Sequence, residues 1–169
     1  MKQDSLQRAI KCLRISDIWQ REASASLGEA LEGKGKFPEQ HEVLFKHVVL
    51  RSLWGKADSE GSTPYVFRVH IAFGVRFVEI ADASETDAEQ DLVKAPALAQ
   101  IESTYVAEYL SEKDPGQNAL KAFALRNASY HVWPFWREFL ASQCARMNLP
   151  KVSLPLQSFA ANREKTEAE

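Results

Sequence analysis

Histidine is the side chain best suited to acid–base and metal chemistry near neutral pH, and the 169-residue chain contains four, His41, His47, His70 and His131. None belongs to an HExxH pattern, a CxxC pattern or a nucleophile signature. His47 and His70 fall in β-rich segments at positions expected to face water, where a surface or capping role is the simplest interpretation. The sequence therefore predicts no catalytic residue and no enzyme.

Metal and phosphate sites are not indicated by the sequence pattern either. Cys12 and Cys144 are far apart and lack a CxxC partner, so we interpret both as packed thiols. The glycines of residues 28–36 lack the GxxxxGK(S/T) spacing of a phosphate loop. The acidic residues of 82–91 lack the alternating ligands and the turn glycine of a calcium loop, and are interpreted as a solvated loop. No metal ion or cofactor is predicted.

The aromatic residues of 127–150 give a clearer signal. Trp136, Phe139 and Leu140 recur at helical spacing after Pro134, which we expect in the first turn of a helix because no amide donor is needed there. A helix must bury one face against its neighbours, so this stripe is predicted to belong to the core.

Three further aromatic residues, Tyr130, Trp133 and Phe135, lie at the expected corner before that helix. A turn rarely lets every ring point inward, so two interpretations stay open: the rings fill the core, or they line an open apolar groove. Phe37 lies in an otherwise polar loop and is likewise either a loop anchor or part of an apolar surface.

Four segments have strand character, residues 14–27, 43–54, 65–77 and 98–110. Segment 65–77 alternates strictly, so its odd-numbered apolar residues are predicted to form one buried face. The solvent-facing side of 65–77 carries positive charges and that of 98–110 carries negative charges. This predicts that the two segments pair as antiparallel neighbours. Glycine and proline make residues 28–40 a crossover loop between the first two strands.

Helices are expected before the first strand and after the last one. A short helix is expected before residue 14, and Asp114, Pro115 and Gln117 are interpreted as an N-cap, a first-turn proline and a capping-box partner of a helix of about three turns. A second helix is expected from Pro134. Strands followed by two helices predict an α+β fold.

The composition is that of one globular domain, with 45% hydrophobic and 26% charged residues and a net charge of -2. We therefore treat residues 1–169 as a single domain with a charged, mobile tail from about residue 160. This charge offers no general attraction for nucleic acid. The sequence shows neither a secretory signal nor an apolar run that could cross a membrane, so a cytoplasmic location is expected.

The stretch from "IESTYVAEYL" through "NLPKVSLPLQ" resembles the SecB family of chaperones, including its SecB-like branch associated with toxin–antitoxin systems. In that family a last strand leads to a helix, an apolar corner with proline, a helix with an Arg-Glu pair and an "LP" segment. The matching residues here are Trp133, Pro134, Phe135, Arg137, Glu138, Leu149, Pro150, Val152 and Leu154.

The resemblance implies a four-stranded antiparallel sheet packed with two helices, assembled as a homotetramer (a dimer of dimers). It also implies an ATP-independent holdase that binds unfolded or non-native polypeptides in apolar grooves. The implied client-binding residues are Phe37, Leu44, Phe45, Tyr130, Trp133 and Phe135.

Export chaperones of this family dock the SecA motor through acidic residues on the outer face of the sheet. The resemblance places Glu22 and Glu102 at such positions, but Tyr105 and Val106 stand where export members have paired glycines. Two roles therefore stay open, a general holdase serving protein export and a dedicated chaperone of one partner such as an antitoxin. The breadth of the client range distinguishes them.

Overall fold

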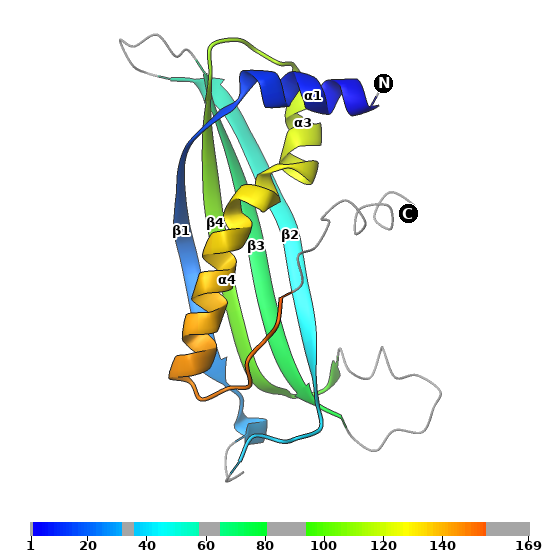
Figure 1. Cartoon of the computed structure of the whole chain (residues 1–169), viewed down its shortest axis with the longest axis vertical. Coiled ribbons are helices and arrows are strands. Elements are labelled where there is room, and N and C mark those ends of the chain that lie inside the picture. The colour runs from blue at the N-terminus through cyan, green and yellow to red at the C-terminus, as the bar shows by residue number, and fades with distance from the viewer. Residues whose placement is uncertain (1, 32–35, 58–64, 81–93, 155–169) are drawn as a thin grey trace.

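The computed structural model describes residues 2–31, 36–57, 65–80 and 94–154 (Figure 1). The predictions for residues 82–91 and for the tail from residue 160 lie outside this described part. The elements in chain order are α1 (Lys2–Cys12), β1 (Arg14–Leu27), the 3-10 helix η1 (Glu29–Leu31), β2 (His41–Lys56), β3 (Tyr65–Glu79), β4 (Ala97–Ser111), α3 (Gln117–Arg126) and α4 (Ala128–Arg146).

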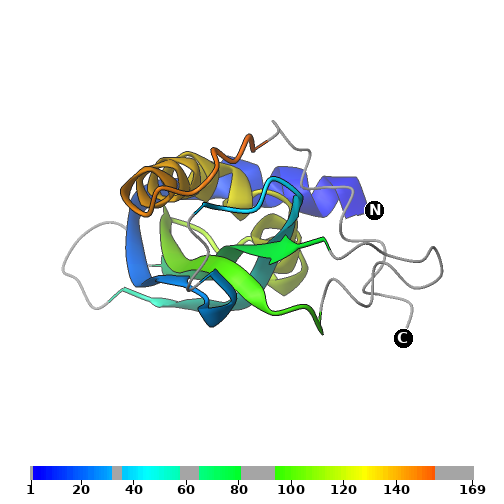
Figure 2. The ribbon, with the colours of Figure 1, turned by 90° about the horizontal axis from the view of Figure 1, so that it is seen from below.

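The strands form one four-stranded antiparallel sheet in the order β1-β4-β3-β2. The chain therefore crosses the full width of the sheet between β1 and β2, which are its two edges. Helices α1, α3 and α4 all lie on one side of the sheet (Figures 1 and 2). We call this the inner face and the uncovered side the outer face. The α+β fold with a four-stranded antiparallel sheet and two C-terminal helices is confirmed.

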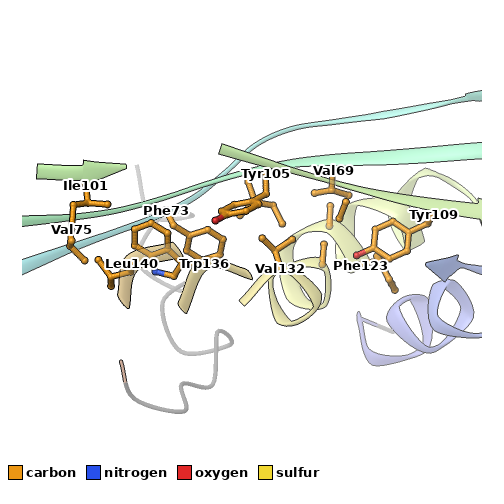
Figure 3. Close-up of a cluster of buried hydrophobic side chains, with 14 of the residues drawn as sticks. Val69, Phe73, Val75, Ile101, Tyr105, Tyr109, Phe123, Val132, Trp136 and Leu140 are labelled. Atoms are coloured by element: carbon orange, nitrogen blue, oxygen red, sulfur yellow. The ribbon is translucent and has the colours of Figure 1, made fainter. Parts of the chain in front are cut away.

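The core lies between the inner face and α4. The odd-numbered apolar residues of β3 from Phe67 to Phe77 are buried as predicted, whereas Tyr65 at the start of the strand is only partly buried. The buried residues pack with β4 and with Trp136 and Leu140 of α4 (Figure 3). Burial of each large apolar side chain contributes about 2 kcal/mol. This packing fixes the position of α4 over the sheet.

The outer face carries the charge pairing expected between β3 and β4. Arg68 and Glu108 are opposite each other in the register, and the Arg68 Nε lies 2.7 Å from Glu108 Oε2. His70 was expected to face water, and that expectation is wrong, since the side chain is only 6% exposed. The Arg21 guanidinium lies 3.5 Å from the His70 Nδ1. Burial is the main cause that lowers the pKa of His70, and the positive charges of nearby arginines lower it further.

His47 was also expected to face water, and it instead points toward the helices. It pairs with Phe73 of the buried face, stacks on that ring at 4.9 Å, and its Nε2 lies 2.8 Å from Ser129 Oγ of α4. The sequence of β2 has apolar residues on both sides and a register shift between Val49 and Arg51. Its alternation therefore does not reveal which side is buried.

The start of α3 differs from the sequence prediction. Gly116, with a φ of 87°, is the N-cap, and no side chain caps the helix. Asp114 instead closes a tight turn, because its Oδ1 accepts a hydrogen bond from the Gly116 amide at 2.7 Å. The positive φ suits glycine, which has no Cβ to clash there.

The start of α4 also differs. Only Asn127 separates α3 from α4, and Pro134 lies inside α4 rather than at its first turn. A proline inside a helix removes one backbone hydrogen bond and costs about 3 kcal/mol. The buried stripe that begins at Ala128 and continues through Val132 and Trp136 offsets this cost.

Residues 149–154 turn back along the inner face after α4. Asn148 has a φ of 54°, and the Leu149 amide donates to the Cys144 carbonyl at 2.9 Å. Leu149 is buried, and Val152 and Leu154 pack against the core. In Figure 1 this segment runs back beside α4 on the side of β2.

Candidate functional site

An apolar strip lies on the inner face beside β2. The strip lies beside three successive inward residues of β3, which are Phe77, Val75 and Phe73. Each of these three residues lies next to one residue of the strip. The Phe37 ring lies 5.6 Å from Phe77, and the Trp133 ring lies 5.8 Å from Phe73. Phe45 pairs with Val75 between them. The strip therefore runs along β3 past three consecutive inward residues.

The strip is open to solvent at its β2 side. Phe45 is 58% exposed although it lies on the inner face. Tyr130, one helical turn before Trp133, is 43% exposed and extends the strip along α4. Phe37 and Trp133 are half-buried and pack against the core. We call Phe37, Phe45, Tyr130 and Trp133 the β2-side strip.

Two of the six expected client-binding residues lie elsewhere. Leu44 pairs with Arg76 on the outer face, so strand alternation separates it from Phe45. Phe135 follows Trp133 by two helical positions, which is about 200° around the helix. Its side chain is 47% exposed, and its main-chain carbonyl accepts a hydrogen bond from the Tyr105 hydroxyl of β4 at 3.3 Å. The structure thus does not bring Leu44 or Phe135 to the strip.

Buried polar contacts hold α4 against the sheet beside the strip. His47 reaches Ser129, and His131 Nδ1 lies 2.8 Å from the Tyr109 hydroxyl. Burial lowers the pKa of His131 and raises the pKa of Tyr109, so both groups are uncharged at neutral pH. These anchoring contacts were not predicted from the sequence. No signal in the sequence marks the inward side of β2, because this strand carries apolar residues on both of its sides.

The two acidic residues expected to dock a partner both lie on the outer face. Glu102 holds Lys46 through a contact of 2.9 Å, and this hydrogen bond lowers the pKa of Glu102. The ion pair crosses over Gly74, where a Cβ would lie 3.1 Å from the Glu102 Cγ. Glu22 is exposed and lies 3.4 Å from the Arg21 Nε. Each carboxylate therefore already has a cation beside it.

Other sites are less developed in the described residues. A cleft of about 570 Å³ at one end of the sheet is lined by Lys11, Cys12, Arg14, Ile15, Leu110, Ser111, Glu112 and Lys113. No group of three or more His, Cys, Asp or Glu side chains is placed to hold a metal ion in the described ranges. No helix among these residues is long and apolar enough to cross a bilayer.

Comparison with known proteins gives a match at the level of structure. No protein-family model and no curated protein matches the chain. A similar solved structure is that of the Mycobacterium tuberculosis SecB-like chaperone Rv1957 in complex with a ChAD peptide from the HigA1 antitoxin. It shares 18% sequence identity, covers 92% of this chain and 97% of its own, and has a TM-score of 0.63. The chain therefore has a SecB-like fold.

Proposed function

We propose that this protein is an ATP-independent chaperone, a holdase that binds unfolded or non-native polypeptides. The observation that carries the proposal is the β2-side strip, where Phe45 and Tyr130 keep 58% and 43% of their surface exposed. An exposed aromatic surface on a globular domain marks a binding site for apolar groups. The antitoxin peptide bound to the similar SecB-like structure supports a polypeptide ligand.

The shape of the strip suits a client without a fixed fold. Phe37, Phe45 and Trp133 lie beside three successive inward positions of β3, so they form a line rather than an enclosed pocket. An extended chain can lie along such a line and gain affinity from several modest contacts. Binding of this kind needs neither a nucleotide nor a catalytic group.

A second candidate is a dedicated chaperone of one partner such as an antitoxin. Two observations favour it over a role in export with SecA. The similar structure holds an antitoxin peptide. Glu102, at a position where an export chaperone would contact SecA, is already engaged with Lys46.

The test of the proposed function is the affinity of the purified protein for a panel of unrelated unfolded polypeptides, without nucleotide and at physiological salt. Salt at this concentration screens simple charge attraction. Submicromolar binding to several polypeptides is expected of a general holdase, and binding to one antitoxin alone is expected of a dedicated chaperone. Failure to bind any of them, an antitoxin peptide included, would overturn the proposal.

Substitution Phe45→Glu is expected to weaken client binding about tenfold, because it places a charge in the middle of the strip and removes one large apolar contact. Leu53→Glu is the matched control, since Leu53 is 48% exposed on the same strand but lies on the outer face. Both residues are exposed, so the melting temperature of each variant should stay close to that of the wild type. Fluorescence anisotropy with a labelled unfolded polypeptide measures the affinity. Equal losses in the two variants would contradict the role of the strip.

We further propose that copies of the chain assemble as a homotetramer through the opposite flank of α4. Ile15, Leu27 and Phe135 are 49%, 51% and 47% exposed on the side of the molecule near β1. Ile15 and Leu27 lie near the two ends of β1, and exposed apolar residues spread along one flank in this way are typical of an interface between subunits. Light scattering is expected to give a tetramer for the wild type and a smaller species for Phe135→Glu. The Phe45→Glu variant should keep the wild-type mass, and a monomeric wild type would refute the assembly.

A further inference from the structure

Strand β2 is an edge of the sheet with a long uninterrupted run. It pairs with β3 on one side only, and no strand among the described residues pairs with its other side. The register with β3 is regular from His41 to Val49, where the first irregularity occurs. A run of this length extends over about 30 Å.

The opposite edge is less suited to pairing. The register of β1 with β4 shifts between Ile15 and Asp17 and again between Gln20 and Glu22. Such irregularities bend a strand and interrupt the even row of main-chain groups that a partner strand needs. The run His41–Val49 is therefore the better template for an added strand.

The second side of this run faces no other strand in the part of the chain that the structure describes. On an edge strand every second residue directs its N–H and C=O groups away from the sheet, where they bond water or an added strand. These donors and acceptors favour an extended partner over a helical one, because a helix satisfies its own main-chain groups internally.

The side chains of the run would meet an added strand on both faces. On the inner face Phe45 is 58% exposed, so the inward residues of an added strand would cover it. Those residues would also lie next to the rest of the β2-side strip. On the outer face Val48 is 43% exposed and would contact the alternate residues of the partner. The free edge and the strip thus form one continuous surface.

We propose that the client binds by strand addition, with an extended segment pairing along His41–Val49 as a fifth strand of the sheet. This inference rests on the proposed function and names its client class. The preferred segments have alternating apolar residues, high β propensity and no proline within the paired run. Aromatic residues of the strip then select the inward side chains, and the backbone pairing supplies affinity that is independent of sequence.

The test uses synthetic peptides of alternating valine and threonine, as long as the His41–Val49 run and labelled for anisotropy. In an added strand only every second peptide amide donates to the edge. N-methylation of one such amide is expected to weaken binding about tenfold, because it removes a donor and blocks the pairing. N-methylation of the neighbouring amide, which points to solvent, should leave the affinity within about twofold of the parent.

The possible outcomes distinguish strand addition from the proposed holdase function. Equal affinity for all methylated peptides, together with tight binding of the parent, would overturn strand addition and leave the holdase in place. Binding of unfolded polypeptides without binding of the parent peptide would also overturn strand addition. Failure of every polypeptide to bind would overturn the proposed function itself.

Hydrogen exchange provides an independent readout on the intact chain. The parent peptide is expected to slow the exchange of alternate amides in His41–Val49 at least about tenfold, while the β1 amides keep their rates. Protection of β1 rather than β2 would contradict the choice of edge. Protection of β2 that grows with protein concentration in the absence of peptide would show that a second copy occupies the edge, and would likewise refute the inference.

Discussion

Substitution Trp136→Ala is expected to lower the free energy of unfolding by about 4 kcal/mol. Trp136 is 1% exposed, and its ring stacks on Phe73 at 5.7 Å with an interplanar angle of 14°. Truncation to alanine leaves a cavity between a sheet and a helix. Neither backbone can collapse into that cavity without breaking hydrogen bonds, so little of the loss is recovered.

The measurement is chemical unfolding in urea, supported by the melting temperature, which should fall by about 10 °C for a chain of this size. Tyr130→Ala is the matched control, because Tyr130 is an aromatic residue of the same helix but is 43% exposed. Its loss should stay below about 1 kcal/mol. A loss of similar size in both variants would contradict the packing of α4 on β3.

Trp136 of the core and Trp133 of the β2-side strip both contact the ring of Phe73. Substitutions at Trp133 therefore affect stability as well as binding. Trp133 contacts the same ring at 5.8 Å, so Trp133→Ala removes both a strip residue and part of the core packing. A loss of binding in that variant therefore mixes two effects. A loss of binding on substitution of Phe45 is easier to interpret, because most of this side chain lies in solvent and contributes little to the core.

The strand pattern of β3 was predictable from sequence because its large apolar residues alternate with charged and small residues from Phe67 to Phe77. Its odd-numbered residues from Phe67 to Phe77 are apolar and buried, which is the simplest case of binary alternation. β2 could not be predicted in this way. As an edge strand it carries apolar residues on both faces, so Leu44 and Phe45 look equivalent in sequence and lie on opposite faces in the structure.

The aromatic cluster of α4 shows a second limit of sequence reasoning. A corner at Pro134 would have allowed Tyr130, Trp133 and Phe135 to line one surface. The helix instead continues through Pro134, because burial of Val132 and Trp136 on either side outweighs one missing hydrogen bond. Helical geometry then directs Trp133 toward β3, whereas Phe135 lies about 200° around the helix and is 47% exposed. Local sequence cannot reveal this balance, since it depends on contacts with distant strands.

Substitution Gly28→Ala is expected to lower the free energy of unfolding by about 3 kcal/mol. A Cβ at this position would lie 1.8 Å from the Ala97 carbonyl oxygen and 2.8 Å from the Ala97 carbonyl carbon. Both atoms belong to the backbone at the start of β4, so no side chain can rotate away. The Gly28 amide also donates to the Leu98 carbonyl at 2.9 Å, and moving the chain to admit a methyl group would break this bond.

Gly55→Ala is the matched control for unfolding in urea. Gly55 is a strand glycine at which an added Cβ would have no atom within 4 Å, and its substitution should change stability by less than about 1 kcal/mol in either direction. The effect at Gly28 should extend to binding, because Gly28 begins the connection that carries Phe37 from the β1 edge to the inner face beside Phe77. Loss of stability with intact client affinity in the remaining folded protein would show that this connection, and Phe37 with it, is not needed for binding.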